Sequence, residues 1–238
     1  MTPAKLHSTS IYILTKLAPK HQQQASRTTS DSMASNSYTL LMTLLALSAP
    51  LAVVAGDPDI LADFIVPASA NPTNITGDFF TYTGFRDIST PAYGFTLTKA
   101  TMMEFPALNG QSVSYAMLTF PSGSVNPTHT HPRASELLVL VHGALSVGFI
   151  DTANKLYTQD LGPGDMFVFP KGTVHYQFNQ GNSTATALSA FGSATPGLVS
   201  VPLAVFDTSI DNAILAKSFK TDEATIQKLK AGLAFRCC

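Results

Sequence analysis

The stretch GSVNPTHTHPRASELLVLVHG, residues 123–143, decides both the fold and the site that we predict for this chain. Within it, His129, His131 and Glu136 follow the spacing H-x-H-x4-E. Residues two apart on an extended segment point the same way, so the two imidazoles share one face. The turn-forming residues 132–135 can double the chain back, so that Glu136 opens the next strand near them. The spacing therefore predicts three of the ligands that a metal site needs.

A fourth candidate ligand, His175, lies in the stretch GDMFVFPKGTVHYQFN, residues 164–179. From residue 173 onward this stretch alternates with a period of two, which is typical of a β-strand. A histidine on the polar face of a strand inside an apolar domain needs a partner. If the two stretches form neighbouring hairpins of one barrel, His175 completes a set of three histidines and one carboxylate. The apolar face carries Val174, Tyr176 and Phe178, and the polar face carries Thr173, His175, Gln177 and Asn179.

Short β-type runs separated by turn residues follow one another from Tyr93 onward, with no long helix between them. This spacing predicts an all-β domain, an antiparallel barrel or sandwich. The run 137–141 is apolar on both faces, so we expect the barrel interior to cover one face, and a subunit contact could cover the other. The predicted runs are residues 112–120, 137–141, 144–150, 155–161, 166–169, 173–178, 185–191 and 198–206.

The period changes near the end of the chain, where residues 211–219 and 221–233 are predicted to be helices. In the second helix, Thr221 is a candidate cap, and Ile226, Leu229 and Leu233 form an apolar stripe. Such stripes usually pack in a core. On a small barrel, we expect another subunit to be the partner.

The two stretches also carry a family resemblance. They match both cupin motifs position by position, as G-x5-H-x-H-x4-E-x6-G from Gly123 and as G-x5-P-x-G-x2-H-x3-N from Gly164. The letters HTHPRA at residues 129–134 resemble specifically the germins and germin-like proteins of plants, with similarity from about residue 57 to about residue 233. The resemblance implies a single cupin (jelly-roll) β-barrel with an N-terminal arm and C-terminal α-helices.

The chain divides on this reading into five segments. Residues 1–32 are a leader of uncertain status. They are either an upstream start, with Met33 as the true first residue, or a transit-type extension, which a segment poor in acids and rich in Ser and Thr resembles. Residues 33–55 are predicted to be a secretory signal peptide cut after Ala55. Its apolar run falls short of the roughly 20 residues that span a bilayer, so we expect no membrane anchor. The N-terminal arm is 56–90, the barrel 91–206 and the C-terminal helical segment 207–238.

Charge and cysteine usage limit the partners and the crosslinks. The formal net charge of the chain is −1, and residues 1–32 hold four bases against one acid. Without these residues the chain carries −4. A negatively charged chain has no electrostatic attraction for nucleic acid, so we expect no nucleic-acid binding. The only cysteines, Cys237 and Cys238, are adjacent at the end, either free or paired between chains. Ile65 stands where germins carry the first cysteine of an N-terminal disulfide, so we expect packing alone to hold the arm. Asn74 and Asn182 begin glycosylation sequons.

The metal and the oligomer follow only from the resemblance. From the donors alone, imidazole suits Zn, Cu, Fe and Ni, whereas carboxylate and water suit Mn. Resemblance to germins implies Mn, held by His129, His131, Glu136 and His175, in a secreted homo-oligomer of the apoplast, a hexamer built as a trimer of dimers. His142 falls outside the motif and is interpreted as an ordinary strand-end residue.

Two positions concern the reaction. Asn126 corresponds to an asparagine that helps to hold substrate in oxalate-oxidising germins, which makes it a candidate catalytic residue; otherwise it is a turn-former before Pro127. The second such asparagine is expected at position 116, where this chain has Ala116, and a methyl group donates no hydrogen bond. Oxalate oxidation is therefore disfavoured.

Two functions remain. The first is superoxide dismutation at an extracellular Mn site, with superoxide as the small-molecule substrate and a role in defence or stress. The second is a non-catalytic structural or receptor-like glycoprotein whose metal mainly stabilises the barrel.

Overall fold

The computed structural model describes residues 56–86 and 94–234 of the 238-residue chain. The predicted leader, the signal peptide and the two terminal cysteines lie outside these residues. No helix in the described part of the chain is long and apolar enough to cross a bilayer.

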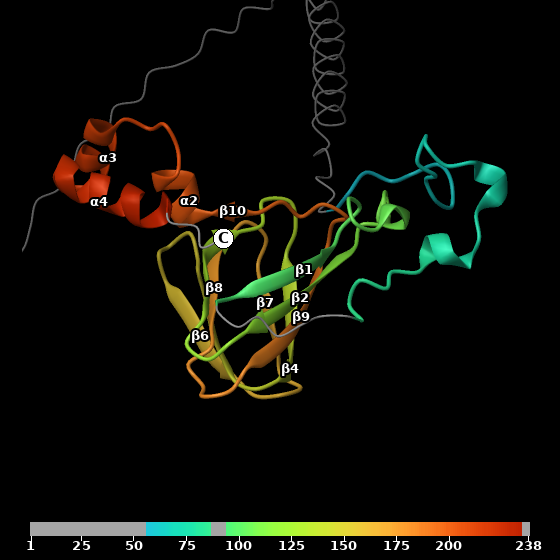
Figure 1. Cartoon of the computed structure of the whole chain (residues 1–238), viewed down its shortest axis with the longest axis horizontal. Helices are drawn as coiled ribbons and strands as arrows, with labels where there is room; N and C mark the ends of the chain where they lie inside the picture. The colour runs from blue at the N-terminus through green and yellow to red at the C-terminus, as the bar shows by residue number, and fades with distance from the viewer. Residues whose placement is uncertain (1–55, 87–93, 235–238) are drawn as a thin grey trace, which may run out of the picture. The chain divides into compact units, whose positions relative to one another are not determined.

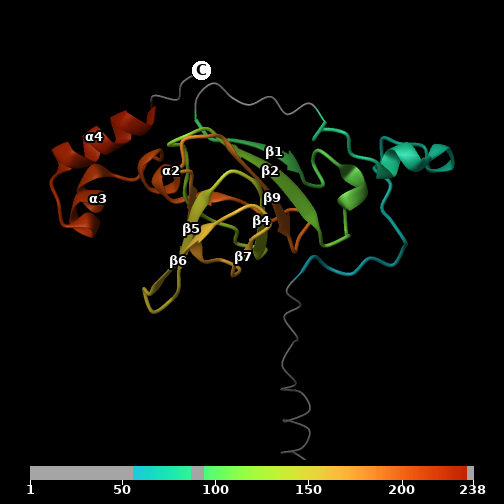
Figure 2. The ribbon, with the colours of Figure 1, turned by 90° about the horizontal axis from the view of Figure 1, so that it is seen from below.

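Two antiparallel five-stranded sheets form the barrel, with strand orders β1-β2-β9-β4-β7 and β10-β3-β8-β5-β6 (Figure 1). The all-β prediction is confirmed. Seen after a quarter turn, the two sheets enclose a common interior (Figure 2). The strands are β1 (Thr96–Ala100), β2 (Ser114–Phe120), β3 (Val125–Thr130), β4 (Glu136–His142), β5 (Leu145–Ile150), β6 (Leu156–Leu161), β7 (Met166–Phe169), β8 (Val174–Phe178), β9 (Ala185–Phe191) and β10 (Val199–Ser200).

The apolar core lies inside the barrel, and β4 contributes to it. On β4, Leu138 and Leu140 are fully buried, whereas Leu137 and Val141 on the other face are 44% and 55% exposed. Burial of each leucine side chain contributes about 1.5–3 kcal/mol. The period of two thus places one face of the apolar run in the core and leaves the second face partly exposed.

Strand β8 turns its polar face inward. His175, Gln177 and Asn179 are at most 2% exposed, whereas the apolar residues between them are only partly buried. Buried polar groups need hydrogen-bond partners. Asn179 has them, because its Nδ2 donates to the carbonyl oxygens of Phe120 at 2.7 Å and Ser183 at 2.8 Å. The inward polar face is what brings His175 to the site.

One predicted strand is mostly helix. Residues 198–206 were expected to be extended, but only β10 is, and α2 (Val201–Phe206) follows it at once. Pro202 lies in the first turn of α2, where its fixed φ suits a helix and its missing N–H costs nothing. Strands β1 and β3 are not among the predicted runs. In β3, Pro127 coincides with a shift of register between Asn126 and His129, because proline cannot donate to the ladder.

The N-terminal arm is fastened to the barrel by hydrogen bonds as well as by packing. The carboxylate of Asp57 accepts from Ser193 Oγ and from the Ala194 backbone N, each at 2.6 Å. The Tyr82 hydroxyl donates a hydrogen bond to the Lys99 carbonyl oxygen, with an oxygen–oxygen distance of 2.7 Å. The prediction of packing alone is therefore corrected. Two short 3-10 helices, η1 (Pro72–Asn74) and η2 (Gly77–Phe80), lie within the arm, and η3 (Pro106–Leu108) lies between β1 and β2.

The two predicted C-terminal helices are present as α3 (Asn212–Phe219) and α4 (Glu223–Ala234). Ile226 and Leu215 are buried between them, while Leu229 is 45% exposed. The side chain that caps α4 belongs to Asp222 and not to Thr221, since its Oδ1 accepts from the Thr225 backbone N at 2.8 Å.

Candidate metal centre

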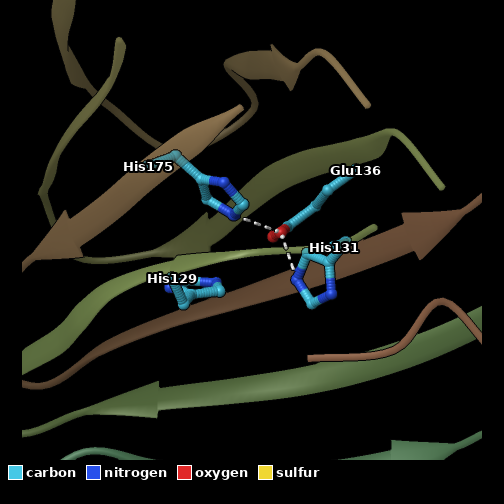
Figure 3. Close-up of side chains that lie close together, drawn as sticks. All are labelled: His129, His131, Glu136 and His175. Carbon is cyan, nitrogen blue, oxygen red and sulfur yellow. Dashed lines mark hydrogen bonds and ion pairs between the residues drawn. The ribbon is translucent and has the colours of Figure 1, made fainter. Parts of the chain in front are cut away.

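Four residues from both sheets meet inside the barrel (Figure 3). His129 on β3 and His175 on β8 are directly paired across the strands, so their side chains share one face. Glu136 is the first residue of β4 in the opposite sheet, and His131 follows β3. All four are 2–8% exposed, and their candidate ligand atoms lie within 4.8 Å of one another. The structure thus brings together every ligand predicted from the motif spacing.

The three imidazoles are oriented by backbone carbonyls. In each ring, Nδ1 lies within hydrogen-bond distance of a carbonyl oxygen, and because a carbonyl can only accept, Nδ1 must carry the hydrogen. That leaves Nε2 as the ligand atom, and such an outer contact is the usual support of a metal-binding histidine. The partners are Pro127 for His129 at 2.7 Å, Gly197 for His131 at 2.5 Å and Thr173 for His175 at 2.9 Å.

Glu136 divides its two oxygens between the cluster and the barrel wall. Its Oε2 lies 3.2 Å from His131 Nε2 and 3.1 Å from His175 Nε2. Its Oε1 accepts from Ser189 Oγ at 2.6 Å and from Gln177 Nε2 at 3.3 Å. One oxygen is therefore fixed by the protein, and the other is directed at the place where a metal would be held.

The charge states also suit a metal. Burial alone would raise the pKa of Glu136, but the hydrogen bonds and charges of His131 and His175 lower it to about 2. Burial, together with the charge of His175, lowers the pKa of His129 to about 4. An ionised carboxylate and a neutral imidazole are the forms that bind metal ions, so the donor set fits a divalent cation.

Asn126 belongs to the same network. It is 9% exposed, and its Nδ2 donates to Gln177 Oε1 at 2.7 Å, so a chain of hydrogen bonds runs from Asn126 through Gln177 to Glu136. Its catalytic role stays a prediction. Sequence reasoning did not single out Gln177 or Ser189 as part of the site. The signal for Gln177 is its position two residues after His175, which places both on the same face of the strand. The signal for Ser189 is that it is the polar residue in the otherwise apolar run LSAF, residues 188–191 of β9.

Replacement of Ser189 by alanine is expected to weaken metal binding about tenfold or more, since changes to such outer contacts typically cost 10–100-fold in metal affinity. The change removes the 2.6 Å hydrogen bond that orients the Glu136 carboxylate and adds no volume. Metal affinity is measured by competition with a chelator. Ser114→Ala is the matched control, because Ser114 is equally buried but donates to the Ser193 carbonyl at 2.7 Å. Equal affinities in the two variants would contradict the assigned role.

A cavity of about 350 Å³ adjoins the cluster. Asn126, His129, His131 and Glu136 line it on one side, and Ala116 on β2 lines it on another. The volume lies in the range of small-molecule sites. The two sequon asparagines, Asn74 and Asn182, are exposed in the arm and after β8, and glycosylation there stays a prediction.

The comparisons agree with this geometry. Two antiparallel sheets around a buried three-histidine, one-glutamate cluster define a cupin, and the family model described as cupin matches residues 86–227. The chain is 67% identical over 206 residues to germin-like protein 9-3 of Oryza sativa subsp. japonica, which covers 83% of this chain and 96% of the relative. Germin-like protein 9-1 of the same plant is 56% identical over 205 residues, with coverages of 83% and 82%. The chain belongs to the germin-like proteins of the cupin family.

Among solved structures, an oxalate oxidase in complex with the substrate analogue glycolate is similar, with a TM-score of 0.70. It is 31% identical, over 75% of this chain and 98% of that chain. The fold and the candidate metal site are thus those of a germin-like cupin.

Proposed function

We propose that this protein is a secreted manganese-binding germin-like protein that dismutates superoxide in the plant apoplast. The observation that supports the proposal most is the buried three-histidine, one-glutamate cluster, which supplies four protein ligands and opens on a cavity. A six-coordinate ion held by four ligands keeps open positions for a small substrate. A Mn ion bound there would supply one-electron chemistry, alternating between Mn(II) and Mn(III).

The chain's own residues have two tasks in this reaction. The dismutation takes two superoxide anions and two protons to dioxygen and hydrogen peroxide, so the site must admit an anion and hold its ligands rigid through both steps. Ser189 and Gln177 fix the Glu136 carboxylate, and the backbone carbonyls fix the three rings. Asn126 lines the cavity beside His129, where an amide hydrogen could contact a bound anion.

Manganese is favoured by the resemblance to germins and is compatible with the donor set. The carboxylate is a hard ligand of the kind that Mn prefers, while the imidazoles would also accept Zn, Cu, Fe or Ni. The donors alone do not choose among these ions.

Superoxide decay followed by stopped flow tests the proposal. Protein loaded with Mn should accelerate the decay in proportion to bound Mn, and protein loaded with Zn should not, because Zn fills the same ligands without a redox change. If both forms leave the decay at the uncatalysed rate, the redox function is refuted and the metal is structural.

The second candidate function is a non-catalytic extracellular glycoprotein with a stabilising metal. The observation that favours it is that the candidate ligands lie on two different sheets. His129 and His175 belong to one sheet and Glu136 to the other, so a bound ion would crosslink the two sheets. Oxalate oxidation is not proposed, since the cavity wall at position 116 is a methyl group.

Secretion, N-glycosylation at Asn74 and Asn182, and a role in defence or stress are part of the proposal. Hydrogen peroxide, the product of dismutation, is the link to defence. Mass spectrometry of protein from plant culture medium should give a chain that begins at Gly56 and carries glycans on the two asparagines. A chain that retains residues before Met33 would contradict the predicted signal peptide.

We also propose a homo-oligomer, a hexamer built as a trimer of dimers by resemblance to germins. The outer face of β4 and β7 supports a contact with a second copy, because Leu137 is paired with Val168 and both are exposed, at 44% and 54%. Light scattering should show an oligomer that Val168→Asp disrupts. Leu156→Asp, at a similarly exposed leucine of β6, is the control and should leave the assembly unchanged.

A further inference from the structure

The Glu136 carboxylate is the end of a chain of hydrogen bonds that begins at the wall of the cavity. Its Oε2 faces the cluster, while its Oε1 accepts from Ser189 Oγ at 2.6 Å and from Gln177 Nε2 at 3.3 Å. We propose that Gln177, aligned by Asn126, is a positioning residue that sets the reduction potential of the metal ion through Glu136. The inference rests on the redox metal of the proposed function, but its test does not depend on superoxide turnover.

An irregularity in β3 brings Asn126 into this chain of hydrogen bonds. On a regular strand, residues three apart point to opposite faces, so Asn126 and His129 would be separated. The register of β3 against β8 shifts between them, and Asn126 is paired with Gln177 while His129 is paired with His175. Gln177 and His175 are two apart on β8 and share a face. The irregularity therefore places Asn126 on the face that carries the site.

Asn126 determines which way the Gln177 side-chain amide points. Gln177 Oε1 accepts a hydrogen bond from Asn126 Nδ2 at 2.7 Å, and an amide oxygen cannot donate. The donor end of the amide, Nε2, is therefore the end that faces Glu136. The reversed amide would set one acceptor oxygen against another. Asn126 thus keeps Gln177 in the orientation that supports the carboxylate.

The network lies where hydrogen bonds act most strongly on a charge. Gln177 and Ser189 are 0% exposed and Glu136 is 2% exposed. In a buried environment of low dielectric constant, hydrogen bonds are stronger and polarise one another along a chain. Asn126 lines the cavity, whereas Gln177 lies outside its lining. A bound substrate would therefore meet Asn126, and the route from Gln177 to the ion is the Glu136 carboxylate.

The direction of the effect follows from the charge of the ion. A carboxylate ligand stabilises Mn(III) more than Mn(II), because the attraction between charges grows with the charge of the ion. Each hydrogen bond donated to Glu136 draws negative charge away from the ion and weakens this preference. Hydrogen bonds to ligand atoms are among the means by which proteins adjust reduction potentials. Loss of the Gln177 donor should therefore favour Mn(III) and lower the potential.

The test is a redox titration of the Mn-loaded full chain with mediators, in which electron paramagnetic resonance quantifies Mn(II) and elemental analysis gives total Mn. Gln177→Met removes the donor and keeps an unbranched side chain. At the midpoint potential of the unaltered protein, the ratio of Mn(II) to Mn(III) in this variant should be about tenfold lower, which is 59 mV for one electron. Ser189→Ala, which removes the other hydrogen bond, should lower the ratio as well. An unchanged or higher ratio in fully loaded Gln177→Met overturns the inference.

Two further variants separate the potential from general structural effects. Gln180→Met is the matched control, because the exposed Gln180 donates to Asp160 Oδ1 at 3.2 Å, and the ratio should not change. Asn126→Ala, at the cavity wall, tests the alignment and replaces Gln177→Met if that variant folds poorly. It should lower the ratio alone but add nothing in the presence of Gln177→Met, since Asn126 acts through Gln177. Additive effects of the two changes would contradict the alignment.

The results separate the inference from the proposed function. A lower ratio in Gln177→Met without superoxide turnover in the unaltered protein supports the inference and refutes dismutation. Turnover with an unchanged ratio does the reverse. A bound metal that the mediators cannot oxidise or reduce overturns both.

Discussion

His131→Ala is expected to abolish stoichiometric metal binding and, with it, superoxide turnover. The His131 ring is one of the four candidate ligands, and the Gly197 carbonyl holds its Nδ1 at 2.5 Å so that Nε2 faces the cluster. Changes to outer contacts already cost about 10–100-fold in metal affinity, so the loss of a ligand should cost more than about 100-fold. Metal content after gel filtration and the rate of superoxide decay measure the two effects.

His142→Ala is the matched control for this experiment. His142 ends β4, is exposed and lies outside the cluster, so its loss should leave metal content and turnover unchanged. If His131→Ala retains full metal, the assigned ligand set is wrong. If both variants lose metal, general destabilisation rather than the loss of a ligand is the cause.

Removal of the metal should lower the melting temperature sharply, which is the second large effect. An ion that binds only the folded chain stabilises it by about 4 kcal/mol when its free concentration is 1,000 times Kd. For a domain of 150–250 residues, each kcal/mol shifts Tm by about 2–4 °C, so chelation should lower it by about 8–16 °C. The physical reason is that a bound ion would hold β3 and β8 of one sheet to β4 of the other.

Calorimetry with and without a chelator, at constant protein concentration, measures this shift. The His131→Ala variant should show the low melting temperature from the start and no further change with chelator. An unchanged Tm in wild-type protein that has demonstrably lost its metal would mean that the ion contributes nothing to stability, and would contradict the crosslink between the sheets.

The ligand set could be predicted because short-range geometry determines much of it. On a strand, side chains two positions apart share one face, which relates His129 to His131. The turn before Glu136 is indicated by the turn-forming residues Pro132 and Ser135. The resemblance to cupins then related this stretch to the second, which carries His175. The two stretches do lie side by side, because β3 pairs with β8 and β4 pairs with β7. They are not the hairpins that the hypothesis assumed, since each stretch crosses from one sheet to the other.

The parts that sequence reasoning missed depend on contacts between distant segments. Ser189 becomes significant only when β9 pairs with β4 and brings its hydroxyl to Glu136. Likewise, the fastening of the arm needs Asp57 to meet residues more than a hundred positions away. The error at residues 198–206 has a different cause, since the alternation of valines there mimics a strand while Pro202 in fact begins a helix.

The most direct test of the central claim is the identity and amount of metal in the protein as plant cells secrete it, measured by mass spectrometry without added metal and confirmed by electron paramagnetic resonance. The predicted result is stoichiometric manganese, in the proportion of a single ion to each chain. Protein that is folded and secreted but carries no metal, or carries zinc in manganese's place, would contradict the account.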